Sequence, residues 1–241
     1  MSMIAFSKLY RAVLFCAALF PSWASHAAPM LQGPDLDLSI QHYSRVMTAE
    51  GVLRETRYDE TMMRRPGHVW LARVLPASHR AKHSYGHQPA AKKSHNHKHP
   101  NYEVLPRHVM LDRDKIRLEV VNAEERDIIF VPPAEYDNAN FDGSWVNAFF
   151  LMDPQRVAAL PLSKRPSAVA GARWREQEKN GLFQRVLWDD TRMVPLVVET
   201  GDRAGTFFER VTIRPLPTLA KSLPWTKTKG YAQREYSDFL D

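Results

Sequence analysis

The residues best suited to binding a metal ion are histidines crowded into one short segment. Six of the ten histidines in the 241-residue chain lie within 21 residues: His79, His83, His87, His95, His97 and His99. Neutral imidazole is a good ligand for zinc, copper and nickel. The last three histidines alternate along the chain and would share one side of an extended segment. The first three have helical spacing, but Gly86 and Pro89 oppose a stable helix there.

The composition around these histidines predicts a disordered loop rather than a preformed site. Residues 77–101 contain almost no large apolar side chain, so they cannot bury a core. No Asp or Glu occurs between Pro76 and Asn101, so no local carboxylate can orient an imidazole ring. Three interpretations stay open: weak binding of zinc, copper or nickel; a solvated linker without a metal role; and a loop that becomes strongly cationic below about pH 6.5 and contacts an anionic membrane surface. No cofactor is required by any of them.

Familiar catalytic patterns are missing from the sequence. There is no glycine-rich phosphate loop and no HExxH motif, and Gly143-Ser144-Trp145 is not a nucleophile elbow. The carboxylate pair Asp189-Asp190 is better explained by a turn. His42, His68 and His108 are the remaining candidates for a hydrolase whose residues are scattered along the chain. We therefore expect a protein that is not an enzyme.

The first 27 residues have the features of a secretory signal peptide. Lys8 and Arg11 precede an apolar run over residues 12–20, and Ser25-His26-Ala27 predicts cleavage after Ala27. An uncleaved membrane anchor is the alternative. The only cysteine, Cys16, follows the bulky Phe15, which argues against a lipoprotein signal. The sequence thus predicts a periplasmic protein that carries no lipid anchor and, after cleavage, no thiol.

The charge balance argues against nucleic acid as a partner. The whole chain has a net charge of +6, and removal of the signal peptide leaves 31 basic and 27 acidic residues. Nucleic-acid-binding proteins usually gather their basic residues on one face or helix. Here the basic residues mostly alternate with acidic ones, and export makes such a partner less plausible still.

The hydrophobic pattern of the rest of the chain predicts a sheet interrupted by helices. Apolar spacing at Leu36, Ile40, Tyr43 and Met47 indicates an amphipathic helix over residues 36–49. Strands are expected at 52–61, 67–75, 107–111, 116–120, 126–131, 174–178, 182–188, 195–200 and 206–213. Asn180-Gly181 suits a tight hairpin. Helices are expected over residues 141–152 and, behind the Asp153-Pro154 cap, up to Leu160.

Hairpin-linked strands with inserted helices favour an α+β fold with a strongly curved antiparallel sheet, an open or half β-barrel. We expect this domain to span residues 28–217. The tail, residues 218–241, is expected to be irregular and to end in a short helix, on the spacing of Tyr231, Glu235, Tyr236 and Phe239. No βαβ rhythm is seen, so a parallel doubly wound sheet is not expected.

The order of motifs resembles the half-barrel of the LolA and LolB lipoprotein carriers and of the RseB/MucB stress regulators. The best match is residues 181–214, where Trp188-Asp189, Pro195-Leu196 and Asp202 precede a final strand. Residues 126–132 and 52–75 resemble the strand before the inserted helix and the opening hairpin. The His-rich segment and the C-terminal tail depart from the family, and the second domain of the stress regulators is missing.

The resemblance implies a concave apolar surface that holds an acyl chain or an envelope protein segment. Its expected lining residues are Trp70, Leu118, Val120, Phe149 and Trp188. On this basis the sequence predicts an exported, non-enzymatic binding protein for a hydrophobic ligand or protein segment, active in lipoprotein handling or envelope stress sensing. The alternative is a periplasmic metal-binding or metal-sensing protein that acts through the His-rich loop.

Overall fold

A computed structural model describes residues 32–76 and 104–236. The expected signal peptide, the six histidines of residues 79–99 and the last five residues lie outside the described ranges. In the described residues, no helix is long and apolar enough to cross a membrane.

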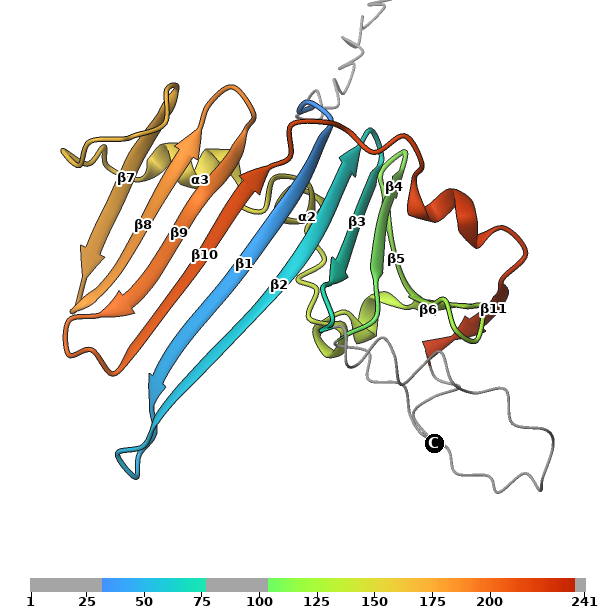
Figure 1. Cartoon of the computed structure of the whole chain (residues 1–241), viewed down its shortest axis with the longest axis horizontal. Coiled ribbons are helices and arrows are strands. Elements are labelled where there is room, and N and C mark those ends of the chain that lie inside the picture. The colour runs from blue at the N-terminus through green and yellow to red at the C-terminus, as the bar shows by residue number, and fades with distance from the viewer. Residues whose placement is uncertain (1–31, 77–103, 237–241) are drawn as a thin grey trace, which may run out of the picture. The chain divides into compact units, whose positions relative to one another are not determined.

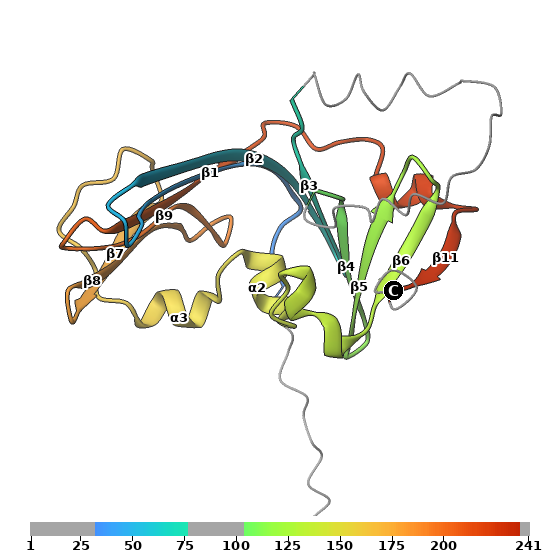
Figure 2. The same ribbon diagram turned by 90° about the horizontal axis from the view of Figure 1, so that it is seen from below.

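The described residues form one open sheet of 11 strands, in the order β11-β6-β5-β4-β3-β2-β1-β10-β9-β8-β7. The bounds are β1 (Leu36–Met47), β2 (Leu53–Arg65), β3 (His68–Arg73), β4 (Arg107–Asp112), β5 (Lys115–Asn122), β6 (Asp127–Val131), β7 (Ala172–Lys179), β8 (Leu182–Asp189), β9 (Val194–Asp202), β10 (Phe207–Pro215) and β11 (Ala232–Glu235). All neighbours are antiparallel except β11, which runs parallel to β6. The sheet bends into an arch, and helices α2 (Trp145–Phe150) and α3 (Pro154–Ala159) lie beneath its concave face (Figures 1 and 2). The predicted curved antiparallel sheet with inserted helices is confirmed.

The strands that sequence patterns predicted are present, and the predicted turn at Asn180-Gly181 has the expected backbone. Asn180 and Gly181, between β7 and β8, both adopt positive φ angles, 52° and 75°. That combination defines a turn whose twist matches the two flanking strands. Lys179 pairs with Leu182 directly across it. The local sequence is therefore sufficient to fix this hairpin and its register.

The expected helix over residues 36–49 is wrong, because residues 36–47 form strand β1. Leu36, Leu38 and Ile40 are all buried and alternate along one face with a period of two, whereas Tyr43 and Met47 project from the other face and are not buried. Strand β1 bonds to β2 on one side and to β10 on the other. Backbone pairing on both edges outweighs a helical spacing that rested on four residues.

The inserted segment is helical only in part. The helix expected over residues 141–152 is reduced to α2, and its N-terminus is capped by Ser144, whose hydroxyl accepts a hydrogen bond from the Asn147 amide. Asp153 caps α3 in the same way through the Gln155 amide. The Asp153 cap agrees with the sequence interpretation, and both caps satisfy amide groups that a helix start leaves unpaired.

The C-terminal tail does not form the expected helix within its described part. Residues 232–235 form β11, and a 3-10 helix, η3 (Pro224–Thr228), precedes it. The β6 edge would otherwise expose unpaired backbone groups, which β11 satisfies. The approach to β11 is anchored at β1, where Asp37 accepts hydrogen bonds from the amides of Leu216 (2.7 Å, backbone oxygen) and Ala220 (2.6 Å, carboxylate).

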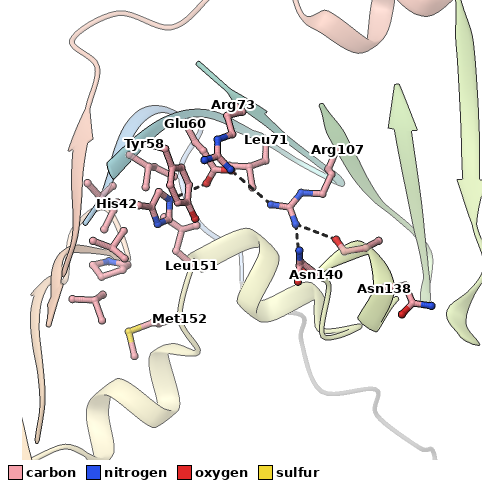
Figure 3. A pocket seen from close by; sticks show the side chains of 16 residues that line it. His42, Tyr58, Glu60, Leu71, Arg73, Arg107, Asn138, Asn140, Leu151 and Met152 are labelled. Atoms are coloured by element: carbon pink, nitrogen blue, oxygen red, sulfur yellow. Dashed lines mark hydrogen bonds and ion pairs between the residues drawn. The ribbon is translucent and has the colours of Figure 1, made fainter. Parts of the chain in front are cut away.

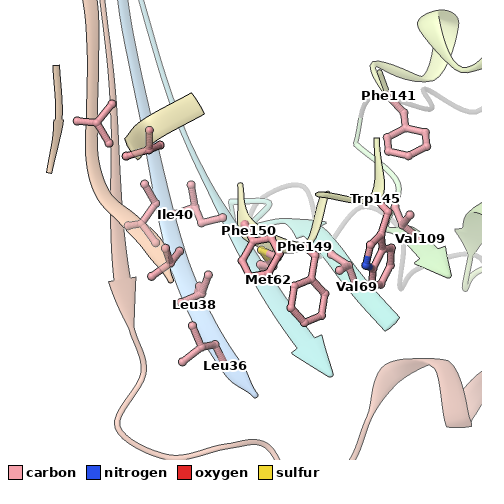
Figure 4. Packing of buried hydrophobic residues seen from close by; sticks show 14 of the residues in the cluster. Leu36, Leu38, Ile40, Met62, Val69, Val109, Phe141, Trp145, Phe149 and Phe150 are labelled. Carbon is pink, nitrogen blue, oxygen red and sulfur yellow. The ribbon is translucent and has the colours of Figure 1, made fainter. Parts of the chain in front are cut away.

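The hydrophobic core lies between the concave face and the inserted helices. Leu38, Ile40 and Met62 from the sheet face Phe149 and Phe150 of α2 (Figure 4). Phe150 is fully buried. Burial of such side chains is the main favourable contribution to folding.

One fully buried cation, Arg64 at the end of β2, ties this core together. Its guanidinium donates hydrogen bonds to four carbonyl oxygens: Pro34 at 2.9 Å, Phe149 at 3.2 Å, Arg192 at 2.8 Å and Met193 at 3.3 Å. It also lies 4.8 Å from the centre of the Phe149 ring. Burial lowers the pKa of Arg64 to about 10, which still leaves the group charged at neutral pH.

Substitution Arg64→Met should destabilise the protein strongly, because it removes every donor from these carbonyl groups while keeping most of the volume of the side chain. We expect a loss of unfolding free energy on the order of 3 kcal/mol or more, measured by urea denaturation. The control, Arg54→Met, alters an exposed arginine of the same strand. Equal stability of the two variants would contradict the role given to Arg64.

Candidate ligand-binding cavity

A cavity of about 610 Å³ lies between the concave face of the sheet and the inserted segment. Its walls come from strands on both sides of β1 and from the residues next to α2. The lining residues are Ile40, His42, Tyr58, Glu60, Leu71, Arg73, Arg107, Asn138, Ala139, Asn140, Leu151, Met152, Pro195, Val198, Val211 and Ile213. The sheet bends and α2 is short, so the space under the arch is not completely filled by protein.

One part of this lining is apolar. Ile40 on β1, Val211 and Ile213 on β10, and Val198 on β9 stand side by side because these strands are hydrogen-bonded neighbours with Ile40 opposite Ile213 and Val211 opposite Val198. Leu151 and Met152, just after α2, reach the cavity from the other side (Figure 3). This wall can hold a hydrocarbon chain but offers it no hydrogen bond.

The other part is polar and charged. His42 Nε2 donates a hydrogen bond to Glu60 Oε2 at 2.8 Å, and its ring stacks on Tyr58 with the centroids 4.3 Å apart. The guanidinium of Arg73 lies 3.7 Å from the centre of the Tyr58 ring. Arg107 lies 3.9 Å from Glu60 and donates to the carbonyl oxygens of Ala139 and Asn140 (Figure 3).

These groups give the polar end an excess of positive charge. Two guanidinium groups, of Arg73 and Arg107, face one carboxylate, Glu60. These three groups by themselves give the described lining one net positive charge. A guanidinium group presents planar N–H donors that match a carboxylate or phosphate. The arrangement can therefore attract an anion at one end of an otherwise apolar cavity.

Burial and charge act on Glu60 in opposite directions. Burial by itself raises the pKa of Glu60, but the hydrogen bond from His42 and the positive charges of His42, Arg107 and Arg73 outweigh it. The net pKa of Glu60 lies below its ordinary value of 4.5. Glu60 is thus a carboxylate at neutral pH and orients His42, and it leaves the cationic groups only partly neutralised.

A second, smaller cavity of about 270 Å³ adjoins the first. The two share Leu71, Arg107, Asn140 and Leu151 in their linings. Most of the other residues around the smaller cavity are apolar: Met62, Val69, Val109, Leu118, Phe141 and Ala148. The pair offers a path for a chain longer than the larger cavity alone would hold.

The five residues that the sequence predicted to line a concave apolar surface do not line the larger cavity. Trp70, Leu118, Val120, Phe149 and Trp188 are all buried, and none of them lines the larger cavity. Leu118 lines the smaller one. Phe149 lies in the core on α2, and Trp70 lies on the opposite face of the sheet, beside His108. The expected metal ligands, His79 to His99, lie outside the described residues.

Sequence reasoning missed most of the polar end. Of its members, only His42 stood among the residues considered for chemistry. The missed signal is on β2, where Tyr58 and Glu60 alternate in step with buried Met62, so that polar side chains occupy core-facing positions. Arg73 and Arg107 lie on strands separated by the His-rich segment, and only the sheet pairing brings them together.

Neither a protein-family model nor a curated protein sequence matches the chain. Among solved structures, PNGF-II matches with a TM-score of 0.37 and 8% identity over 85% of this chain. A LolA superfamily protein from Nitrosomonas europaea matches with a TM-score of 0.33 and 7% identity, over 79% of this chain and 89% of its own. An uncharacterised conserved protein from Thermus thermophilus has a TM-score of 0.35 and 7% identity, over 83% and 90% of the two chains.

One of these structures is named as a LolA superfamily protein, the family that the sequence resembles. The chain spans about a third of the length of the PNGF-II chain, 33%. At these TM-scores the likeness says nothing about ligand or activity.

The charge of Glu60 should make stability depend on pH. A carboxyl group with a lowered pKa in the folded state stabilises the fold fully above its ordinary pKa, and this contribution is lost as the pH falls through the lowered value. Wild type should therefore melt at a higher temperature than Glu60→Gln at pH 7, and the difference should shrink by pH 3. Thermal unfolding at both pH values measures it.

The control is Glu209→Gln, an exposed glutamate on β10, which should change the melting temperature little at either pH. A difference between wild type and Glu60→Gln that is the same at pH 7 and pH 3 would mean that Glu60 contributes through packing and not through charge.

Proposed function

We propose that this chain is an exported, non-enzymatic protein that binds an amphipathic ligand, a hydrocarbon chain with an anionic end, beneath the arch of its sheet. The observation that carries this proposal is the cavity whose apolar wall faces Arg73 and Arg107. Its volume of about 610 Å³ falls within the range of sites that hold small molecules.

The charge of the cavity favours an anionic end group over a neutral one. Arg107 already donates to two carbonyl oxygens, whereas within the described residues Arg73 shows no hydrogen bond from its guanidinium, which lies over the Tyr58 ring and acts on Glu60 through its charge alone. The donors of Arg73 are therefore available to a carboxylate or phosphate. Hydrogen bonds between charged groups are about twice as strong as those between neutral groups.

The residues around the cavity favour binding rather than catalysis. His42 and Glu60 form a pair that could act as a base, but the described lining residues include no serine, threonine or cysteine to serve as a nucleophile. The His42–Glu60 pair instead holds Tyr58 and its neighbours in place. Export would bring the protein to the envelope, where acyl chains with anionic groups, lipoproteins and other envelope segments are its proposed partners.

Palmitate and hexadecanol, which share a 16-carbon chain, test the proposal on delipidated protein. Wild type should bind palmitate more tightly, and Arg73→Met should weaken palmitate binding about tenfold while leaving hexadecanol binding unchanged, because it removes one charged hydrogen bond. Val211→Trp, which fills the apolar wall, should abolish the binding of both. Calorimetric titration gives the affinities.

The matched control is Arg214→Met, an exposed arginine on the opposite face, which should bind both ligands as wild type does. The proposal fails if delipidated wild type binds neither ligand, or if Val211→Trp binds them as wild type does. If Arg73→Met bound neither palmitate nor hexadecanol, Arg73 would not act by recognising an anionic group. The proposal would then be limited to binding of an apolar chain.

A second candidate function is metal binding by the His-rich segment, favoured by the six histidines of residues 79–99. It predicts weak binding of zinc, copper or nickel with little selectivity. Titration of each ion into wild type and into a form that lacks residues 77–101 should show binding of several ions in wild type and at least a large loss of that capacity in the shortened form. Equal capacity in both forms would exclude the segment as the binding site.

A further inference from the structure

Two histidines face each other on the convex side of the sheet, away from the cavity. His68 at the start of β3 and His108 on β4 share a hydrogen bond of 3.0 Å between Nδ1 of His68 and Nε2 of His108. Since each imidazole nitrogen is either a donor or an acceptor, one proton lies between the two. His108 is buried, with 4% of its surface exposed, whereas His68 is partly exposed.

The second nitrogen of His108 is directed at a carboxylate. His108 Nδ1 lies 3.6 Å from Glu119 Oε2, and Arg117 holds the other carboxylate oxygen at 2.7 Å. A carboxylate behind an imidazole fixes the tautomer that leaves the far nitrogen free as a ligand, and it makes that nitrogen more basic. Nε2 is the nitrogen that faces His68, and the 3.6 Å separation between Nδ1 and Glu119 has to shorten to hydrogen-bond length for the carboxylate to orient the ring.

An aromatic ring covers the pair. The indole of Trp225 in η3 stacks on both imidazoles, with centroids 5.2 Å from His68 and 5.3 Å from His108 and interplanar angles of 11° and 14°. The face of an indole attracts a cation, most strongly where water is excluded. A positive ion between the two nitrogens would therefore lie under an attractive surface.

A thioether lies on the same face. Met110 pairs directly with His68 across β3 and β4, and His108 pairs with Trp70. Residues opposite each other in an antiparallel pair project from the same side of the sheet. The thioether and the aromatic face are soft, and imidazole is a borderline ligand that binds copper well, so the set favours Cu(I) over a hard divalent ion.

Zinc fits this set less well. It takes four ligands in structural sites and is mostly held by three or more protein groups, whereas the described residues contain no group of three or more His, Cys, Asp or Glu side chains that could hold a metal ion. With bonds of about 2.0 Å, two ligand nitrogens lie about 3.3 Å apart around a tetrahedral ion and about 4 Å apart around a linear one. The two nitrogens are 3.0 Å apart, so a small increase in this distance is enough to place an ion between them.

We propose that His68 and His108 bind one Cu(I) ion in place of their shared proton, under the indole of Trp225 and with the thioether of Met110 as the neighbouring ligand. The site consists only of described residues and is independent of the cavity and of the histidines of residues 79–99.

The test starts from the full chain in which Cys16 is replaced by serine and all six histidines of residues 79–99 are replaced by asparagine, so that neither the thiol nor these histidines contribute a ligand. Cu(I) is titrated without oxygen against a chromophoric Cu(I) chelator, and Ag(I) serves as a redox-inert probe of the same site. We expect one equivalent to bind and to quench tryptophan fluorescence. His68→Gln, whose amide can still hydrogen-bond to His108, should weaken binding at least about tenfold.

Three further variants assign the ligands. Met110→Leu should weaken binding while keeping the fluorescence response, and Trp225→Phe should remove most of that response. His42→Gln is the matched control, since His42 is also a histidine bonded to a glutamate but lies on the other face, and it should bind Cu(I) unchanged.

Two results would overturn the site. One is equal Cu(I) affinity with and without His68→Gln. The other is displacement of Cu(I) by an equal concentration of Zn(II). Circular dichroism of each variant, together with the shift of the imidazole resonances of His68 and His108 on addition of Ag(I) to the parent, separates loss of a ligand from loss of the fold.

Discussion

The buried guanidinium of Arg64 connects three parts of the chain that no other single group joins within the described residues. It bonds to the segment before β1, to the last turn of α2 and to the turn between β8 and β9. None of its four acceptors is charged, so the charge is dispersed over carbonyl dipoles and the rings of Phe149 and Phe150. Burying a cation in this way is costly unless every donor is used. That requirement fixes where α2 sits under the arch, and so fixes how much of the concave side stays open.

The cavity exists because the sheet is strongly bent and the helices that cover its concave face are short. A sheet that bends this strongly encloses more volume than two helices of six residues each can fill. Phe149 and Phe150 fill the part next to Arg64, and the chain then leaves α2 through Leu151, which has a positive φ of 64°. This turn carries Leu151 and Met152 to the cavity instead of continuing the helix over it. The charged groups opposite, Arg73 and Arg107, are kept in place by Tyr58 and by two carbonyl oxygens rather than by a neutralising partner each.

Much of the fold could be predicted from sequence because its hairpins are local. Asn180-Gly181 specifies a turn by its backbone preferences alone, and Asp153-Pro154 specifies a helix start. Strand β1 could not be recognised, since Leu36, Ile40, Tyr43 and Met47 fit a helical period and only Leu36, Leu38 and Ile40 follow a period of two; pairing with β2 and β10 decides between the two. Strand β11 depends on the free edge of β6, about a hundred residues earlier in the chain. The cavity could not be predicted from sequence either, because His42, Glu60 and Arg107 are brought together only by pairing between strands that are distant in the chain.

Strands β3 and β4 serve both faces of the sheet at once. Leu71 and Arg107 project into the cavity, while His68, Trp70 and His108 project from the other side, because side chains alternate along each strand. The two sites are thus separated by one layer of backbone and share its hydrogen bonds. To admit an ion, the distance between the His68 and His108 nitrogens must increase. The increase can come from rotation of the two side chains or from a larger spacing between β3 and β4. Only a change in strand spacing would also move Arg107. Since β3 and β4 are paired at only four positions, His68 to Leu71, this is where the sheet has few ladder bonds with which to resist such a change.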